Sequence, residues 1–243
     1  RIELVLNSVF HMGNGPDKPL SEEQYQTIRD TEGVMEAIPL SVGDNYKGFR
    51  IVGTLRELFE KHEWRTGRKY ELAAGKWFAD DRQEAVVGFY AARKLGIQVG
   101  QIIHPYHGLD YTGEDSKHDN EFVVTGIMKP TGTPADRVVW IPILGALNLP
   151  GHDSLGFAPS SVLVKFHPRA HEIRMNLPGD YDKRSKELMM PLILKTVGPL
   201  FEKFKAFELA LTAIAALVAL ASAGVILSTL RNAMNEKRRE IAI

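Results

Sequence analysis

Histidines and carboxylates gather between residues 104 and 119, where they could coordinate a metal ion. The group consists of His104, His107, Asp110, Glu114, Asp115, His118 and Asp119. Imidazole and carboxylate groups suit Zn²⁺ or Cu²⁺, so His104, His107 and His118 are candidate metal ligands. The alternative is a polar hairpin loop with solvated side chains, because Gly108 and Gly113 interrupt the segment and no cysteine accompanies it. The sequence leaves both interpretations open.

The other polar residues lack the sequence context that catalysis needs. Ser160, Ser161 and His167 stand outside any G-x-S-x-G turn, which would expose a nucleophilic serine. The glycines at 13–15 and at Gly132 are interpreted as turn glycines, because no G-x-x-x-x-G-K-[ST] phosphate loop occurs in the chain. We therefore predict no enzyme activity, no catalytic residue and no cofactor.

The longest apolar run, residues 209–230, contains no charged residue. As a helix, its ~22 residues would span ~33 Å, enough for the ~30 Å hydrocarbon core of a bilayer. Arg231 and the cluster Glu236-Lys237-Arg238-Arg239-Glu240 follow it, which predicts a cytoplasmic C-terminal end. A buried helix of a soluble protein is the alternative, but such helices rarely run this long without a charge. We predict a membrane anchor, with the residues before it outside the cytoplasm.

Small residues form a stripe along this predicted membrane helix. Ala215, Ala219 and Ala223 recur at intervals of four, and such spacing lets two helix backbones approach closely in lipid. We interpret the stripe as a packing surface for another membrane helix. The alternative is an alanine-rich helix that faces lipid.

The composition excludes some classes of function. The chain has 243 residues, no cysteine and a formal net charge of zero, so no nucleic-acid partner is predicted. It begins at Arg1 and shows no signal peptide. An exported domain before an inward-facing helix needs something to carry its start across the membrane. We therefore expect an upstream membrane helix and a longer protein.

The first part of the chain predicts an α+β unit. Residues 2–10 alternate like a strand, and Ser21 with Gln24 forms a capping box that begins a helix. Residues 34–42 and 48–53 are predicted to pair around a turn at Asp44-Asn45. A second capping box, Thr54 with Glu57, predicts a short helix.

The middle of the chain predicts a β-rich region. Short β-branched runs at 84–88, 101–104, 121–128 and 138–143 are separated by Gly, Pro and Asp, with one helix at 89–95 that ends at Gly96. A strand at 161–166 and a helix near 170–175 are expected to pack back on the first unit. From residue 192 the pattern is helical, with a kink expected at Gly198-Pro199.

Three stretches together carry a resemblance to a known family. They are residues 84–88 (EAVVG) with 95–101 (LGIQVGQ), residues 122–134 (FVVTGIMKPTGTP), and the apolar helix ending in EKRREIAI. In this order and spacing, they resemble the permease family that includes MacB, FtsX and the lipoprotein-release subunits LolC and LolE. The resemblance covers nearly the whole chain.

This resemblance implies an ATP-binding-cassette (ABC) permease with a periplasmic domain between its first and second membrane helices. In the family that domain has an α+β "porter" part and an inserted β-rich "sabre" part, in agreement with the pattern above. The expected boundaries are porter-like 1–70, inserted 71–155, porter-like return 156–190, periplasmic stalk helix 191–208, transmembrane helix 209–230 and cytoplasmic coupling region 231–243. Arg238, Arg239, Glu240 and Ile241 would approach the coupling helix that docks on the ATPase.

The resemblance also implies partners and a location. A separate ATPase subunit would hydrolyse ATP, although in MacB it is fused upstream. The permease would form a homodimer or heterodimer in the bacterial inner membrane, with most of the chain periplasmic, and could engage a periplasmic adaptor or lipoprotein. We predict a subunit that transmits ATP-driven motion or exports a lipoprotein, peptide or small amphiphile. A membrane-anchored sensor or adaptor, and an FtsX-like regulator of a cell-wall hydrolase, remain alternatives.

Overall fold

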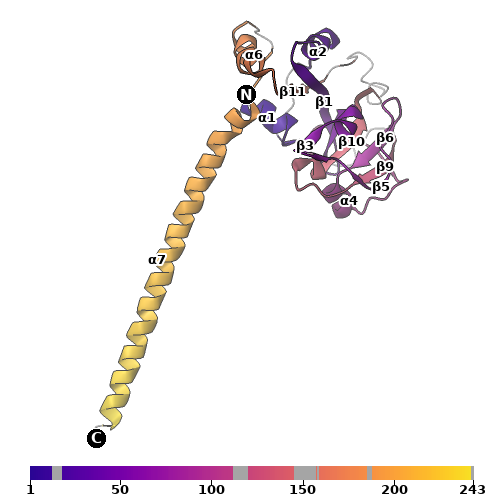
Figure 1. Cartoon of the computed structure of the whole chain (residues 1–243). Coiled ribbons are helices and arrows are strands. Elements are labelled where there is room, and N and C mark those ends of the chain that lie inside the picture. The colour runs from indigo at the N-terminus through magenta and orange to yellow at the C-terminus, as the bar shows by residue number, and fades with distance from the viewer. Residues whose placement is uncertain (13–17, 112–119, 145–156, 158, 185–187, 242–243) are drawn as a thin grey trace. The chain divides into compact units, whose positions relative to one another are not determined.

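The computed structural model describes residues 1–12, 18–111, 120–144, 157, 159–184 and 188–241. The chain divides into two compact units, Arg1–Pro191 and Leu192–Ile243. Figure 1 shows the first as a mixed α+β structure and the second as one long helix. The described part of the chain therefore has the predicted α+β class, followed by a long apolar helix.

A mixed sheet is the framework of the first unit. Its path runs β11-β1-β2-β10-β6-β9-β5, where β10 is parallel to β2, β6 is parallel to β9, and the other neighbours are antiparallel. Two short strands join it, β7 beside β9 and β8 beside β1, while β3 and β4 form a separate hairpin. The bounds are β1 Val34–Tyr46, β2 Phe49–Thr54, β3 Glu63–Arg65, β4 Arg68–Lys69, β5 Leu72–Gly75, β6 Glu84–Val87, β7 Ile102–Ile103, β8 Tyr106–His107, β9 Phe122–Met128, β10 Val138–Pro142 and β11 Ser161–Phe166.

Both faces of this sheet are buried, each in its own hydrophobic core. Successive side chains of a strand point to opposite faces, so Val86 and Val87 in β6 enter different cores. Helix α4 (Phe89–Leu95) adds Ala91 and Ala92 to one core, and α3 (Glu57–Glu60) adds Phe59 to the other. Burial on both sides explains why β6 and β10 are continuous apolar runs and do not alternate.

The remaining helices follow local signals to different degrees. Helix α2 (Glu22–Arg29) begins at the predicted capping box, in which Ser21 and Gln24 bond reciprocally. Helix α6 (His171–Arg184) extends well beyond the predicted 170–175. Helix α7 (Ile193–Ile241) is continuous through Pro199.

Three local predictions were wrong. Residues 2–10 contain helix α1 (Ile2–Ser8) and no strand, because Ile2, Val5 and Leu6 also fit the helical period. Thr54 caps no helix: its hydroxyl donates to the Pro39 carbonyl, and Arg56 occupies the N-cap of α3 without a side-chain bond.

The third error is the position of the first hairpin turn. Strand β1 continues to Tyr46, and the chain reverses at Lys47 and Gly48, both with positive φ. The Asn45 side chain instead accepts a bond from Gly48 N–H and donates to the carbonyls of Gly108 and Asp110.

The strand and helix predictions for the middle of the chain are confirmed in position. Helix α4 ends at Gly96, which adopts a left-handed backbone with φ 66°. Strand β11 pairs with β1, so the last strand returns to the first part of the chain as expected. The division into porter-like and inserted parts at residues 70 and 155 stays a prediction.

Candidate functional sites: the long helix and the polar contacts of the globular unit

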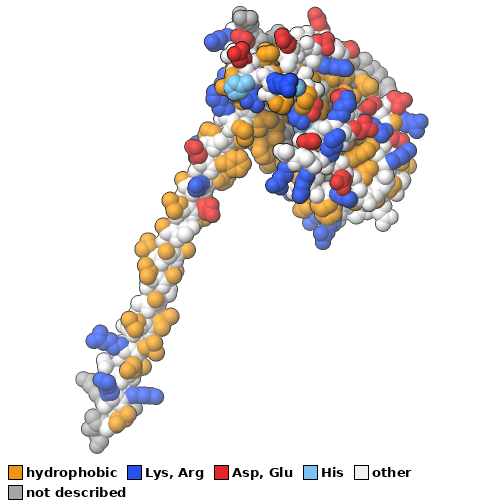
Figure 2. Space-filling view, in the orientation of Figure 1, with side chains coloured by type: hydrophobic (Ala, Val, Ile, Leu, Met, Phe, Trp, Pro, Cys, Tyr) orange, Lys and Arg blue, Asp and Glu red, His pale blue; other side chains and the backbone are white. Residues whose placement is uncertain are grey.

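Helix α7 is the one helix in the described part of the chain that is long and apolar enough to cross a membrane. Its candidate span is Ile193–Arg238, and the most apolar part of that span is not buried against any described residue. Figure 2 shows hydrophobic and uncharged side chains along the helix between charged side chains toward its two ends. An exposed apolar surface of this length is unfavourable in water and favourable in lipid.

Residues 209–230 contain four hydroxyl side chains, and three of them are satisfied within the helix. Thr212, Ser222 and Thr229 donate to the carbonyls of Glu208, Val218 and Val225, each four residues earlier, at 2.8–2.9 Å. An unpaired hydroxyl would be costly in hydrocarbon, where no water can replace the missing partner. These three hydroxyls are therefore compatible with a bilayer.

The predicted packing and coupling residues all lie on α7. Ala215, Ala219 and Ala223 are exposed and, at intervals of four, share one helix face. The backbone of Arg238, Arg239, Glu240 and Ile241 forms the end of the helix. Their roles in helix packing and in ATPase coupling stay predictions.

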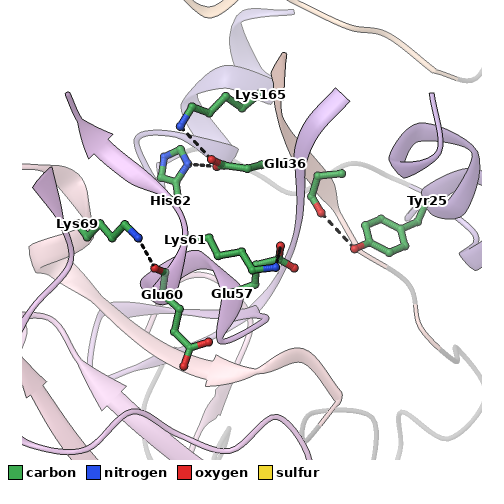
Figure 3. Close-up of polar contacts among 9 residues, drawn as sticks. Tyr25, Glu36, Glu57, Glu60, Lys61, His62, Lys69 and Lys165 are labelled. Carbon is green, nitrogen blue, oxygen red and sulfur yellow. Dashed lines mark hydrogen bonds and ion pairs between the residues drawn. The ribbon is translucent and has the colours of Figure 1, made fainter. Parts of the chain in front are cut away.

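An ion-pair network centred on the buried Glu36 joins β1, β11 and the segment after α3. The Glu36 carboxylate accepts a 2.9 Å bond from Lys165 Nζ and lies 2.7 Å from His62 Nδ1, as Figure 3 shows. A bulge in β1 after Val34 sets Glu36 directly opposite Lys165 of β11. Burial alone would raise the pKa of Glu36, but the bonds and charges of Lys165 and His62 outweigh it and lower the pKa.

This network has a structural role, because it ties β1 to β11 and to the segment after α3. Sequence reasoning missed Glu36, His62 and Lys165. Glu36 and Lys165 are 129 positions apart, and no local spacing marks them as partners.

A second set of polar contacts explains the TGTP sequence at residues 131–134, which is part of the family resemblance. The Asp136 carboxylate accepts bonds from the N–H groups of Thr131 and Gly132 and from the Thr131 hydroxyl, at 2.7–3.1 Å. Gly132 has a φ of 70°, which favours glycine. The motif therefore builds a rigid turn before β10.

Gly88 ends the EAVVG sequence for a steric reason. A Cβ at Gly88 would lie 2.4 Å from the Ala135 carbonyl oxygen. The close approach brings α4 against the 3₁₀ helix η2 (Pro134–Arg137) and lets Gly88 N–H donate to the Val138 carbonyl. The first two stretches that carry the resemblance, 84–101 and 122–134, thus lie next to the same contact between α4 and η2.

The candidate metal ligands receive no support from the described residues. Within that part of the chain, no three His, Asp or Glu side chains are placed to hold a metal ion. His104 Nε2 lies 3.9 Å from the Glu121 carboxylate, His107 is in β8, and His118 lies outside the described residues. Metal binding stays a prediction.

His11 is a further residue that sequence reasoning missed. Its ring meets Trp140 edge-on, with centroids 5.1 Å apart, and its Nδ1 is shielded from solvent and has no hydrogen-bond partner among the described residues. Burial, with a smaller contribution from the charge of Arg50, lowers the pKa of His11 to about 4. The imidazole is therefore neutral at physiological pH.

Comparison with known proteins gives one family match. Residues 3–172 match the family model described as the MacB-like periplasmic core domain. No curated protein matches the chain.

Solved structures with a similar fold include two extracytoplasmic domains. The extracellular domain of the noncanonical ABC-type transporter YknZ from Gram-positive bacteria is 16% identical, with a TM-score of 0.45, over 72% of this chain and 91% of that one. The periplasmic region of MacB from Actinobacillus actinomycetemcomitans is 14% identical, with a TM-score of 0.49, over 76% of this chain and 84% of that one.

Proposed function

This chain belongs to the MacB-like periplasmic core domain family, which is found in ABC-transporter permeases, and on that premise we propose that it transmits ATP-driven motion from a cytoplasmic ATPase to a periplasmic domain. The permease is a non-enzymatic component. The observation that carries the proposal is the family match over residues 3–172, followed by an uninterrupted helix from Ile193 that contains the apolar run 209–230.

The physical basis is the stiffness of α7. At ~1.5 Å per residue its 49 residues extend for ~70 Å, about twice the hydrocarbon thickness of a bilayer. Residues 209–230 would cross the membrane, 193–208 would form the periplasmic stalk, and the end of the helix would lie at the cytoplasmic ATPase. A rod of this kind can move a periplasmic partner although its cargo never crosses the membrane.

The proposed complex contains a separate ATPase subunit and a second permease, identical or different, in the bacterial inner membrane. A periplasmic adaptor or lipoprotein would receive the movement. The coupling contact with the ATPase is assigned to Arg238, Arg239, Glu240 and Ile241.

Weakening helix α7 tests the proposal, and one introduced cysteine is the single cysteine of these 243 residues. A fluorophore on Thr66→Cys, in the exposed β3–β4 turn, reports movement of the globular unit in the reconstituted ATPase complex. We expect an ATP-dependent signal that falls at least threefold in Lys205→Gly/Ala206→Gly, because two glycines weaken the helix by about 2 kcal/mol. Lys205→Ala should keep the signal. An unchanged signal in the double-glycine variant, with ATP hydrolysis intact, would refute the rod.

A matched pair of variants tests the coupling residues. Arg238→Glu/Arg239→Glu should leave the chain in the membrane but abolish its co-purification with the ATPase. Asn235→Ala, in the same helix, should retain the ATPase. If both variants retain the ATPase equally, the assigned coupling residues are wrong.

A further inference from the structure

An arginine lies stacked over two aromatic rings on the surface of the first unit. The Arg137 guanidinium carbon is 4.7 Å from the ring centroid of Tyr90 and 6.0 Å from that of Phe49. The two rings are 6.1 Å apart, at an angle of 55°. Arg137 is exposed, and Tyr90 is 42% exposed. The stack is therefore preformed and open to solvent.

Three rigid elements hold these side chains in place. Phe49 begins β2 after the hairpin turn, Tyr90 lies in the first turn of α4, and Arg137 ends η2. The close approach at Gly88 fixes α4 against η2. The guanidinium is thus positioned by the fold, and little conformational entropy remains to be lost when a ligand binds.

The hydrogen-bonding capacity of Arg137 is unused within the described part of the chain. A cation–π contact uses the positive charge of the guanidinium and consumes none of its five N–H donors. Arg137 makes no hydrogen bond or ion pair with any described residue, and the neighbouring Asp136 carboxylate is directed to Thr131 and Gly132. Among the described residues, therefore, no acceptor occupies these N–H groups.

Further positive charge lies on the same elements. Arg93 and Lys94 lie three and four residues after Tyr90 in α4, and Lys47 precedes Phe49 in the hairpin turn. All three are exposed, and none is paired with a described carboxylate. We call Lys47, Phe49, Tyr90, Arg93, Lys94 and Arg137 the Arg137 surface.

We propose that the Arg137 surface binds the carboxylate side chains of an acidic segment of a second, extracytoplasmic protein. A stacked guanidinium with free N–H groups binds a carboxylate bidentately, and Tyr and Arg are the residues that dominate protein interfaces. A lipid surface fits less well, because here the rings hold the guanidinium and are not free to insert between lipids. The inference is independent of ATP-driven motion.

The test uses the full chain in nanodiscs of neutral phosphatidylcholine. The probe is a fluorescent twelve-residue peptide of Glu-Glu-Gly repeats, and a Gln-Gln-Gly peptide is its uncharged counterpart. We expect saturable binding of the acidic peptide only. The affinity for the acidic peptide should fall at least fivefold in Arg137→Gln. It should fall less in Arg137→Lys, which keeps the charge but cannot bind a carboxylate bidentately. Arg65→Gln, at an exposed arginine of the separate β3–β4 hairpin, should bind as the wild type does.

The outcomes separate a binding role from a structural one. Melting temperatures of all variants are measured first, and if Arg137→Gln unfolds, Arg137→Lys decides the result. Equal peptide affinity in the Arg137 and Arg65 variants would overturn the proposal and leave Arg137 as a contact among β2, α4 and η2. Arg137-dependent binding of phosphatidylglycerol vesicles, without peptide binding, would also overturn it, in favour of a lipid surface.

Discussion

At the residue scale, the position of His11 against Trp140 makes the stability of the first unit depend on pH. The shielded Nδ1 has no partner in the part of the chain that the structure describes, and the charge of Arg50 further disfavours a second proton. His11 therefore takes up a proton more easily in the unfolded chain, where its pKa has the ordinary value of ~6.5, than in the folded chain. It follows that acid destabilises the folded state through this side chain.

The difference between the folded and unfolded pKa of His11 gives the sign and the size of the change in the free energy of unfolding with pH. Because the folded pKa of His11 is about 4, stability falls as the pH drops from ~6.5 towards 4 and changes no further below that. Between pH 7.5 and pH 5 the loss amounts to about 2 kcal/mol. His11→Phe keeps an aromatic ring against Trp140 and should remove this part of the pH dependence.

Urea unfolding of the wild type and His11→Phe at the two pH values measures the difference. The exposed His171→Ala serves as control and should retain the wild-type dependence. Parallel pH curves for the wild type and His11→Phe would show that the buried ring accepts a proton without cost.

At the scale of elements, the joint between α4 and η2 depends on the missing side chain of Gly88. Gly88→Ala would place a methyl group 2.4 Å from the Ala135 carbonyl oxygen, and both segments are backbone that cannot rotate away. We expect a loss of about 2–3 kcal/mol, typical of overpacking, measured by urea unfolding.

Gly96→Ala is the matched comparison. Gly96 has open space around its Cβ position but a φ of 66°, so its substitution costs only the ~1 kcal/mol of a left-handed alanine. If both variants lose the same stability, backbone conformation and not steric contact explains the glycine at position 88.

Helix α7 gives the second prediction at this scale. Leu217 lies near the middle of the uncharged run, and an arginine there costs ~2.5–3.5 kcal/mol in membrane insertion. Leu217→Arg should move much of the chain from the membrane fraction to the soluble or aggregated fraction. Leu230→Arg, beside Arg231, should insert normally, because its charge can reach the interface. Equal membrane retention of both variants would argue against a transmembrane helix.

At the scale of the whole molecule, the first unit contains what an independent domain needs. Two hydrophobic cores lie on the two faces of one sheet. The ion pair of Glu36 with Lys165 links β1 to β11 at the edge of that sheet. We predict that Arg1–Pro191, expressed alone, is soluble and unfolds in one cooperative transition.

Circular dichroism and calorimetry check this prediction. Replacing Lys165 by Met should lower the stability of the isolated unit by about 1–2 kcal/mol, because Lys165 is partly exposed and His62 still contacts the Glu36 carboxylate. A non-cooperative melt of the wild-type unit would mean that it needs the membrane helices to fold.

Features that depend on neighbouring residues could be predicted from the sequence. The capping box of Ser21 and Gln24, the helix end at Gly96 and the strands of the two cores follow from local spacing and from runs of apolar residues. The apolar helix is the strongest case, because ~20 uncharged residues have few alternatives to a membrane span. The resemblance to the MacB-type permeases, which the family match confirms, rests on such local sequences.

What only the tertiary structure decided involves residues far apart in the chain. The apolar residues of 2–10 fit both a strand and a helical period, and the structure shows a helix with Val5 buried. The pairing of Glu36 with Lys165 spans 129 positions, and the stack of Phe49, Tyr90 and Arg137 joins three separate elements. Hydropathy and capping act within a few residues and thus show in sequence, whereas sheet register and side-chain contacts form only when the chain closes on itself.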